Sequence, residues 1–242
     1  MKKALITLSA LSLAGISQMG FAQHGQLNLI NTDVGHGGTN VYFAGSCLMS
    51  FAPDASGVFG TPFDAYCTVL KVDAFIGNTW GATKLDTTSF VPSPNSGVIS
   101  PASWQQTGSE IAWLANNYGV TSNAEQAAAT QLAIWDLAEG GNGTAGDLFF
   151  NSSTGEIRSW SFADNTIPDA VVYAANAVDA YNNGARAVDD WYQADTVQNP
   201  NGSYTHVSQD FVAPAPTPEP LTLGLGLAGV GLAIRRRKRS AV

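Results

Sequence analysis

The residues of this 242-residue chain that could do chemistry in a protected site are one glutamine and two cysteines. Gln131 lies in the segment 122–140. At about 100° per residue, the apolar side chains of that segment form one stripe, made of Ala124, Ala127, Ala128, Ile134, Trp135 and Ala138. Gln131 falls in the middle of the stripe. An unpaired buried amide costs about 1–3 kcal/mol, so Gln131 must have a hydrogen-bond partner in the core. The function of the segment depends on which group that partner is.

Signals at both ends of this segment predict a helix. Ser122 and Glu125 have the spacing of a capping box, in which each side chain accepts a hydrogen bond from a backbone N–H of the first turn. Gly140 and the glycine after it would end the helix. The side opposite the apolar stripe carries Glu125, Gln126, Thr130 and Asp136. We therefore expect an amphipathic helix that turns Gln131 towards the core.

The two cysteines, Cys47 and Cys67, both lie in segments whose composition favours β-strands. In an exported protein the simplest interpretation is a disulfide between them, which would contribute about 2–4 kcal/mol. Two strands make that pairing geometrically possible. The residues alone leave open whether the two sulfurs are joined or whether Cys67 reacts with another group.

The sequence shows no enzymatic site. Its histidines are His24, His36 and His206, and a Cys67–His206 pair suited to a cysteine hydrolase has no supporting motif around it. It contains no metal-ligand spacing, phosphate-binding loop or dinucleotide fingerprint. We therefore expect no enzymatic activity, no cofactor and no metal site.

The two ends of the chain predict export. Residues 1–22 combine a basic start, a largely apolar stretch and small residues before a cleavage point after Ala22, which is typical of a secretory signal peptide. Residues 221–234 form an uncharged apolar run, expected to be a short transmembrane helix. A basic cluster that begins with Arg235, Arg236 and Arg237 follows it and would stay in the cytoplasm.

Pro218, Glu219 and Pro220 precede the apolar run. This order of Pro-Glu-Pro, apolar stretch and arginine cluster resembles the PEP-CTERM sorting signal, which would occupy residues 218–242. The resemblance implies processing by signal peptidase and an exosortase, transient anchoring in the inner membrane, and delivery to the cell surface or extracellular matrix. Residues 213–217 would form a proline-rich stalk.

Residues 23–217 carry 18 acidic and 4 basic side chains, a formal charge of −14. Such a surface is a poor partner for nucleic acid. Extracellular polysaccharide or surface amines are the expected partners.

Residues 23–212 are expected to form one extracytoplasmic α+β domain, an antiparallel β-sheet packed with about three helices. Strands are predicted over 26–30, 41–51 and 65–76, and hairpins over 147–162 and 191–212. Helices are predicted over 108–117 and 169–182, in addition to the central one that carries Gln131. Residues 77–103 are expected to be irregular, with short edge strands.

The surroundings of Cys67 and Gln131 resemble the thioester domains of bacterial surface adhesins. The match comprises the Tyr66-Cys67 pair and the downstream helix sequence TQLAIW, which contains Gln131 and Trp135, and it covers residues 63–140. It implies that the Gln131 side chain acylates the Cys67 sulfur with loss of ammonia. Tyr66 and Trp135 would shield the resulting thioester from water.

A thioester is an activated acyl group, and amines attack it faster than water does. A target amine would displace Cys67 and leave an amide to Gln131. The resemblance therefore implies an adhesin that attaches covalently to amines. The alternative is a non-reactive matrix or glycan-binding domain with a Cys47–Cys67 disulfide, in which Gln131 bonds strand backbone and fixes the helix register.

Overall fold

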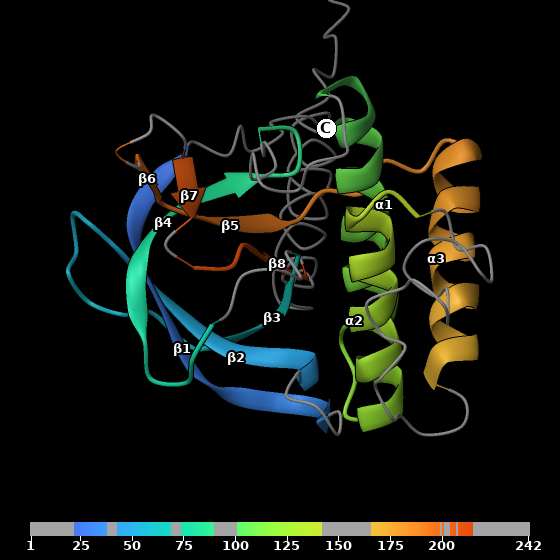
Figure 1. Ribbon diagram of the computed structural model, residues 1–242, viewed down its shortest axis with the longest axis horizontal. Coiled ribbons are helices and arrows are strands. Elements are labelled where there is room, and N and C mark those ends of the chain that lie inside the picture. The colour runs from blue at the N-terminus through green and yellow to red at the C-terminus, as the bar shows by residue number, and fades with distance from the viewer. Residues whose placement is uncertain are drawn as a thin grey trace, which may run out of the picture.

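The computed structural model describes residues 22–37, 43–68, 74–89, 101–141, 166–198, 200, 204–206 and 208–214. In these residues, six strands form a closed antiparallel barrel and three helices pack against one side of it (Figure 1). The expected α+β class, with antiparallel sheet and three helices, is confirmed.

Several predicted segments lie outside the described residues. They are the signal peptide up to residue 21, the hairpin over 147–162, the stalk beyond residue 214, the sorting motif and the apolar run over 221–234. Among the helices that the structure describes, none is both long and apolar enough to cross a membrane.

The barrel strands, in their order around the sheet, are β1 (Gln23–Gly37), β2 (Phe43–Pro53), β3 (Phe63–Cys67), β8 (Phe211–Ala213), β5 (Asp190–Ala194) and β4 (Thr79–Asp86). The strand predicted over 26–30 is longer than expected, because β1 pairs with β2 along one edge and with β4 along the other. A separate two-stranded sheet joins β6 (Thr196–Gln198) to β7 (Tyr204–His206). The hairpin predicted over 191–212 is therefore confirmed. Its base is the pair β5 and β8 in the barrel, and its tip is the separate pair β6 and β7.

The strand predicted over 65–76 is wrong in its extent. β3 ends at Cys67, and a turn occupies residues 75–78, where the Asn78 N–H donates to the Phe75 carbonyl at 3.0 Å. Gly77 in this turn has a φ of 84°, a conformation that glycine adopts without strain. Residues 79–86, expected to be irregular, form β4 because β1 and β5 pair with its two edges.

The helices are α1 (Pro101–Tyr118), α2 (Ala124–Ala138) and α3 (Thr166–Asn182). α1 and α2 lie between the barrel and α3 (Figure 1). Because α2 packs on β1, β2 and β3 on one side and on α1 and α3 on the others, all its residues from Ala127 onwards are buried. The prediction of a polar side for this helix is therefore wrong, since Thr130 and Asp136 are both fully buried.

The first turn of α2 also differs from the expected capping box. Asn123, not Ser122, is the N-cap, and its Oδ1 accepts hydrogen bonds from the N–H groups of Glu125 at 2.9 Å and Gln126 at 3.0 Å. Asn and Ser are comparable N-caps, so propensity could not choose between them. The Thr121 hydroxyl helps to position the cap by accepting a hydrogen bond from the Asn123 N–H at 3.1 Å.

Asn123→Ala should lower the free energy of unfolding by about 1 kcal/mol, because two backbone N–H groups lose their acceptor. Ser122→Ala is the matched control, because Ser122 is the exposed neighbour and should change stability by less than about 0.5 kcal/mol. Urea denaturation measures both variants. An equal or larger loss in Ser122→Ala would show that the cap is misassigned.

Candidate functional site

Gln131 and Cys67 meet where α2 packs on the barrel. The Gln131 Nε2 donates to the Cys67 carbonyl oxygen at 2.7 Å, and the Gln131 Oε1 accepts from the Cys67 N–H at 3.0 Å. Gln131 is fully buried and Cys67 is 8% exposed. One side-chain amide thus satisfies both backbone groups of one strand residue, as a neighbouring strand would. The partner of Gln131 is strand backbone, and that strand residue carries the predicted nucleophile.

The register of β2 against β3 explains why Cys67 is available to this amide. The ladder pairs Cys47 with Ala65, and two further steps in the same register would bring Gly45 opposite Cys67. The ladder ends at Cys47 and Ala65, before those steps. The Gln131 amide supplies the donor and acceptor that β2 would have supplied there, so α2 completes the edge of β3.

The two cysteines lie together on one face of this sheet. Both are buried free thiols, and their side chains are hydrogen-bonded to each other. Cys67 is two residues beyond Ala65, the partner of Cys47, so the two cysteines are diagonal cross-strand neighbours. The hydrogen bond with Cys47, followed by burial, raises the pKa of the Cys67 thiol well above its ordinary value. Cys67 is therefore held as a neutral thiol.

Tyr66 and Trp135, the predicted shielding residues, are both buried in the same core as Cys67. The Tyr66 hydroxyl donates to the Gly119 carbonyl oxygen at 2.8 Å, which ties β3 to the connection between α1 and α2. Burial, followed by the charge of Asp64, raises the pKa of the Tyr66 phenol well above its usual range. Successive side chains of a strand point to opposite faces, so Tyr66 anchors β3 from the face opposite the Cys67 thiol.

Residues 208–210 lie beside the site, although no sequence signal marked them. Ser208, Gln209 and Asp210 are all buried. The Asp210 carbonyl oxygen accepts from the N–H of Thr68 at 2.9 Å, and its carboxylate accepts from the N–H of Ala194 at 2.8 Å. Asp210 therefore joins β5 to the residue that follows Cys67. Three polar residues before a short strand are also the pattern of an ordinary loop, which is why no signal marked them.

The predicted alternative of a Cys67–His206 pair finds no support in the geometry. His206 lies on β7, in the two-stranded sheet outside the barrel, whereas Cys67 ends β3 and contacts Cys47 and Gln131. Over the ranges of the chain that the structure describes, no group of three or more His, Cys, Asp or Glu side chains is placed to hold a metal ion.

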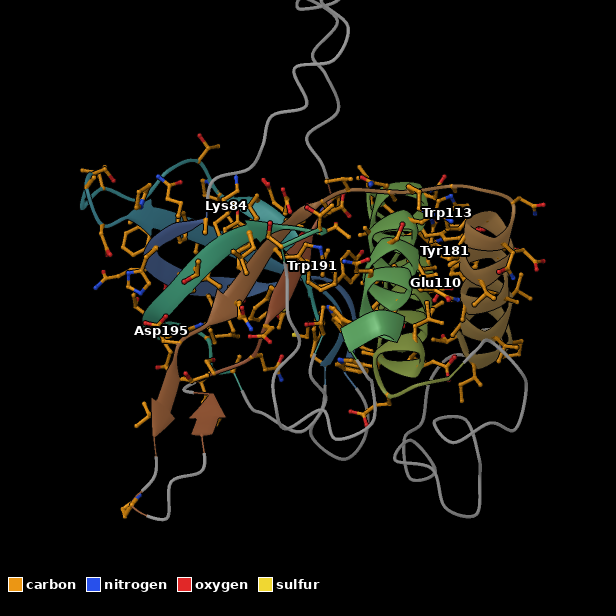
Figure 2. The ribbon with its side chains drawn as sticks, turned by 90° about the horizontal axis from the view of Figure 1, so that it is seen from above. Lys84, Glu110, Trp113, Tyr181, Trp191 and Asp195 are labelled. Carbon is orange, nitrogen blue, oxygen red and sulfur yellow. The ribbon has the colours of Figure 1, made fainter. Side chains whose placement is uncertain are left out.

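His24 forms a second polar cluster, at the start of β1. Its Nδ1 pairs with the Asp54 carboxylate, and its Nε2 pairs with Asp195 at 3.0 Å. Asp195 lies at the far end of β5 from the helices (Figure 2). The hydrogen bond to Asp54, followed by the one to Asp195, raises the pKa of His24 from 6.5 to about 9. The cluster ties the first residues of β1 to two other parts of the barrel.

The His24 cluster predicts a pH dependence of stability. Because the pKa of His24 is raised on folding, its ion pairs stabilise the protein fully below pH 6.5, and this contribution is lost as the pH rises towards about 9. His24→Gln should therefore be less stable than wild type at the acidic end of this range and equal to it above the range. Urea denaturation across the range measures the difference. A constant difference at every pH would contradict the assignment.

The arrangement holds the acyl carbon of Gln131, on α2, at the backbone of the β3 residue that carries the thiol. The Gln131 Oε1, which would become the oxyanion in a tetrahedral intermediate of thioester formation, accepts a hydrogen bond from the Cys67 N–H. This donor could not be identified from the sequence, because it is a backbone group. The Cys67 carbonyl holds the nitrogen that would leave. No protein-family model, curated protein or solved structure matches this chain.

Proposed function

We propose that the protein is an exported, exosortase-sorted component of the cell surface or extracellular matrix, and that an internal Cys67–Gln131 thioester attaches it covalently to amines. The observation that carries the thioester is the double hydrogen bond between the Gln131 amide and the Cys67 backbone. It fixes the amide on the backbone of the residue that carries the thiol, and both residues are buried from water. The signal-peptide pattern of residues 1–22 and the motif of residues 218–242 support export and sorting.

The proposed thioester formation accounts for all atoms. The Cys67 Sγ attacks the Gln131 Cδ, a sulfur–carbon bond replaces the carbon–nitrogen bond, and the thiol proton leaves with the nitrogen as ammonia. The Cys67 N–H stabilises the oxyanion on Oε1 during this step. A thiol with a raised pKa is a poor nucleophile, so the bond forms slowly, once per molecule.

The same pKa protects the product. A sulfur whose thiol has a high pKa is a poor leaving group, so the buried thioester resists displacement by weak nucleophiles such as water. A primary amine is a stronger nucleophile. It takes the acyl group, forms an amide to Gln131 and returns Cys67 to the thiol. The formal charge of −14 on residues 23–217 attracts cationic amines to the domain.

A non-reactive, disulfide-stabilised matrix or glycan-binding domain is the second candidate. The contact between the Cys47 and Cys67 thiols favours it, because two sulfurs in contact need little movement to form a bond. The Gln131 amide also has both hydrogen bonds satisfied without any reaction. In this candidate Gln131 sets the position of α2 on the barrel and does no chemistry.

The intact mass of the mature protein, purified from the native surface fraction, tests the proposal. Processing should remove residues 1–22 and a C-terminal segment that includes Arg235–Arg239, and the thioester should lower the remaining mass by about 17 Da, the mass of ammonia. A disulfide lowers it by only about 2 Da. A protein with neither processing event is not sorted as proposed.

Gln23 requires a control in this measurement. The expected cleavage makes Gln23 the new N-terminus, where it can cyclise and also lose ammonia. Cys67→Ala separates the two sources, because it abolishes the thioester and leaves Gln23 unchanged. A mass loss of about 17 Da that persists in Cys67→Ala comes from Gln23 and contradicts the thioester.

A further inference from the structure

The Cys67 thiol has two possible partners in this structure, and it can bond only one of them at a time. Cys47 contacts its sulfur, and the Gln131 amide is held on its backbone. We propose that Cys47 is a redox gate on the thioester: a Cys47–Cys67 disulfide blocks acylation of Cys67, and its reduction permits acylation. This inference rests on the thioester proposed above and adds its regulation.

The position of Cys47 on the sheet supports this role. Cys47 is 5% exposed and shares a face of the sheet with Cys67, so no loop has to move to bring the sulfurs together. The diagonal neighbours of an antiparallel pair are roughly 7–8 Å apart, beyond the usual Cα spacing of a disulfide, so a bridge requires β2 and β3 to move closer together at this point. A bridge formed in this way is strained and therefore more easily reduced than a structural disulfide. Such lability suits a reversible gate.

The two outcomes differ in their chemistry. Disulfide formation removes two thiol protons and two electrons, and the electrons pass to a protein disulfide of the export compartment, which is reduced to a dithiol. Thioester formation transfers no electrons and releases ammonia. In the oxidised form Gln131 keeps its amide and its two hydrogen bonds to Cys67, so the fold is ready for acylation once a dithiol reduces the bridge.

Cys47 also has a direct effect on the reduced form. Its hydrogen bond is the largest cause of the raised pKa of the Cys67 thiol. Replacing Cys47 with alanine removes both this hydrogen bond and the competing sulfur. Cys47→Ala should therefore acylate faster than wild type under reducing conditions, and oxidants should no longer block it.

Methylamine capture by the mature protein, with and without a disulfide oxidant, tests the gate. Wild-type protein whose Cys67 thiol and Gln131 amide are still intact by mass should lose about 2 Da on oxidation with diamide and then capture no methylamine. After reduction with a phosphine and removal of the reductant, it should lose ammonia and then capture methylamine at Gln131. Cys47→Ala should capture methylamine equally with and without diamide. Cys47→Ser repeats the test with a side chain closer in size and polarity.

The outcomes separate the gate from the thioester itself. Wild-type protein that starts with a free Cys67 thiol and captures methylamine as fully with diamide as without it would overturn the gate and leave the thioester standing. Protein that forms the disulfide but captures no methylamine in any state, including as Cys47→Ala and Cys47→Ser, would overturn both proposals. Blocking by diamide that persists in both Cys47 variants would also overturn the gate, because Cys47 would not be the group responsible.

Discussion

Replacing Gln131 with alanine should lower the free energy of unfolding by about 2–5 kcal/mol. The change leaves the N–H and the carbonyl of Cys67 buried without partners, and each such group costs about 1–3 kcal/mol. The removed atoms also leave a cavity in a helix that is buried on all sides. Equilibrium urea denaturation measures the loss.

Two variants make this result interpretable. Gln131→Met keeps most of the volume and removes only the hydrogen bonds, so it should retain most of the destabilisation if the paired amide is its source. Gln105→Ala, at an exposed position on α1, should stay within about 0.5 kcal/mol of wild type. Gln126 is a poorer control, since its amide donates to the Tyr118 carbonyl at 3.2 Å. Near-neutral behaviour of Gln131→Met would show that packing, not hydrogen bonding, holds α2 in place.

Trp191→Ala should lower the free energy of unfolding by a comparable amount, about 3–5 kcal/mol. Trp191 on β5 is fully buried where the barrel meets the helices (Figure 2). Its ring meets that of Trp104 on α1 edge-on at 6.3 Å, and its Nε1 donates to the Thr87 hydroxyl at 2.9 Å. The substitution therefore removes a large apolar contact between barrel and helix together with a buried hydrogen bond.

Thermal or urea unfolding of Trp191→Phe and Trp113→Ala supplies the comparison. Trp191→Phe keeps a ring in the core and should lower the free energy of unfolding by less than Trp191→Ala does. Trp113 on α1 is the same residue type at a partly buried position, so its replacement by alanine should also cost less. If Trp113→Ala were the more damaging change, the core would not be centred between β5 and α1.

The sequence predicted the helix that carries the site better than it predicted the sheet. The apolar stripe and the end signals of residues 122–140 located α2 and placed Gln131 inside. The amphipathic pattern missed the burial of Thr130 and Asp136, because α3 packs on the side of α2 away from the barrel. The hydrophobic pattern of one helix does not reveal that a second layer of helices covers it, since alanines fit an exposed face and a buried one equally well.

The predicted strands failed where pairing depends on distant residues. Composition favoured a strand through residues 65–76, but β3 has partners only as far as Cys67. Residues 79–86 looked irregular and became β4 because strands from both ends of the domain pair with it. The same non-local pairing brings Cys47 beside Cys67 and places Asp210 next to Thr68. Closure of the barrel, which no local pattern encodes, therefore builds the surroundings of Cys67 and Gln131.

Capture of methylamine at Gln131, located by peptide mass, tests the central claim most directly. Reduced mature protein should gain about 31 Da relative to the thioester form on the peptide that contains Gln131, and the Cys67 thiol should become available to alkylation at the same time. A cyclised Gln23 is a lactam and does not respond. Cys67→Ala should capture nothing. Reduced wild-type protein that takes up no methylamine at Gln131, or a Cys67→Ala variant that takes up as much as wild type, would contradict the account.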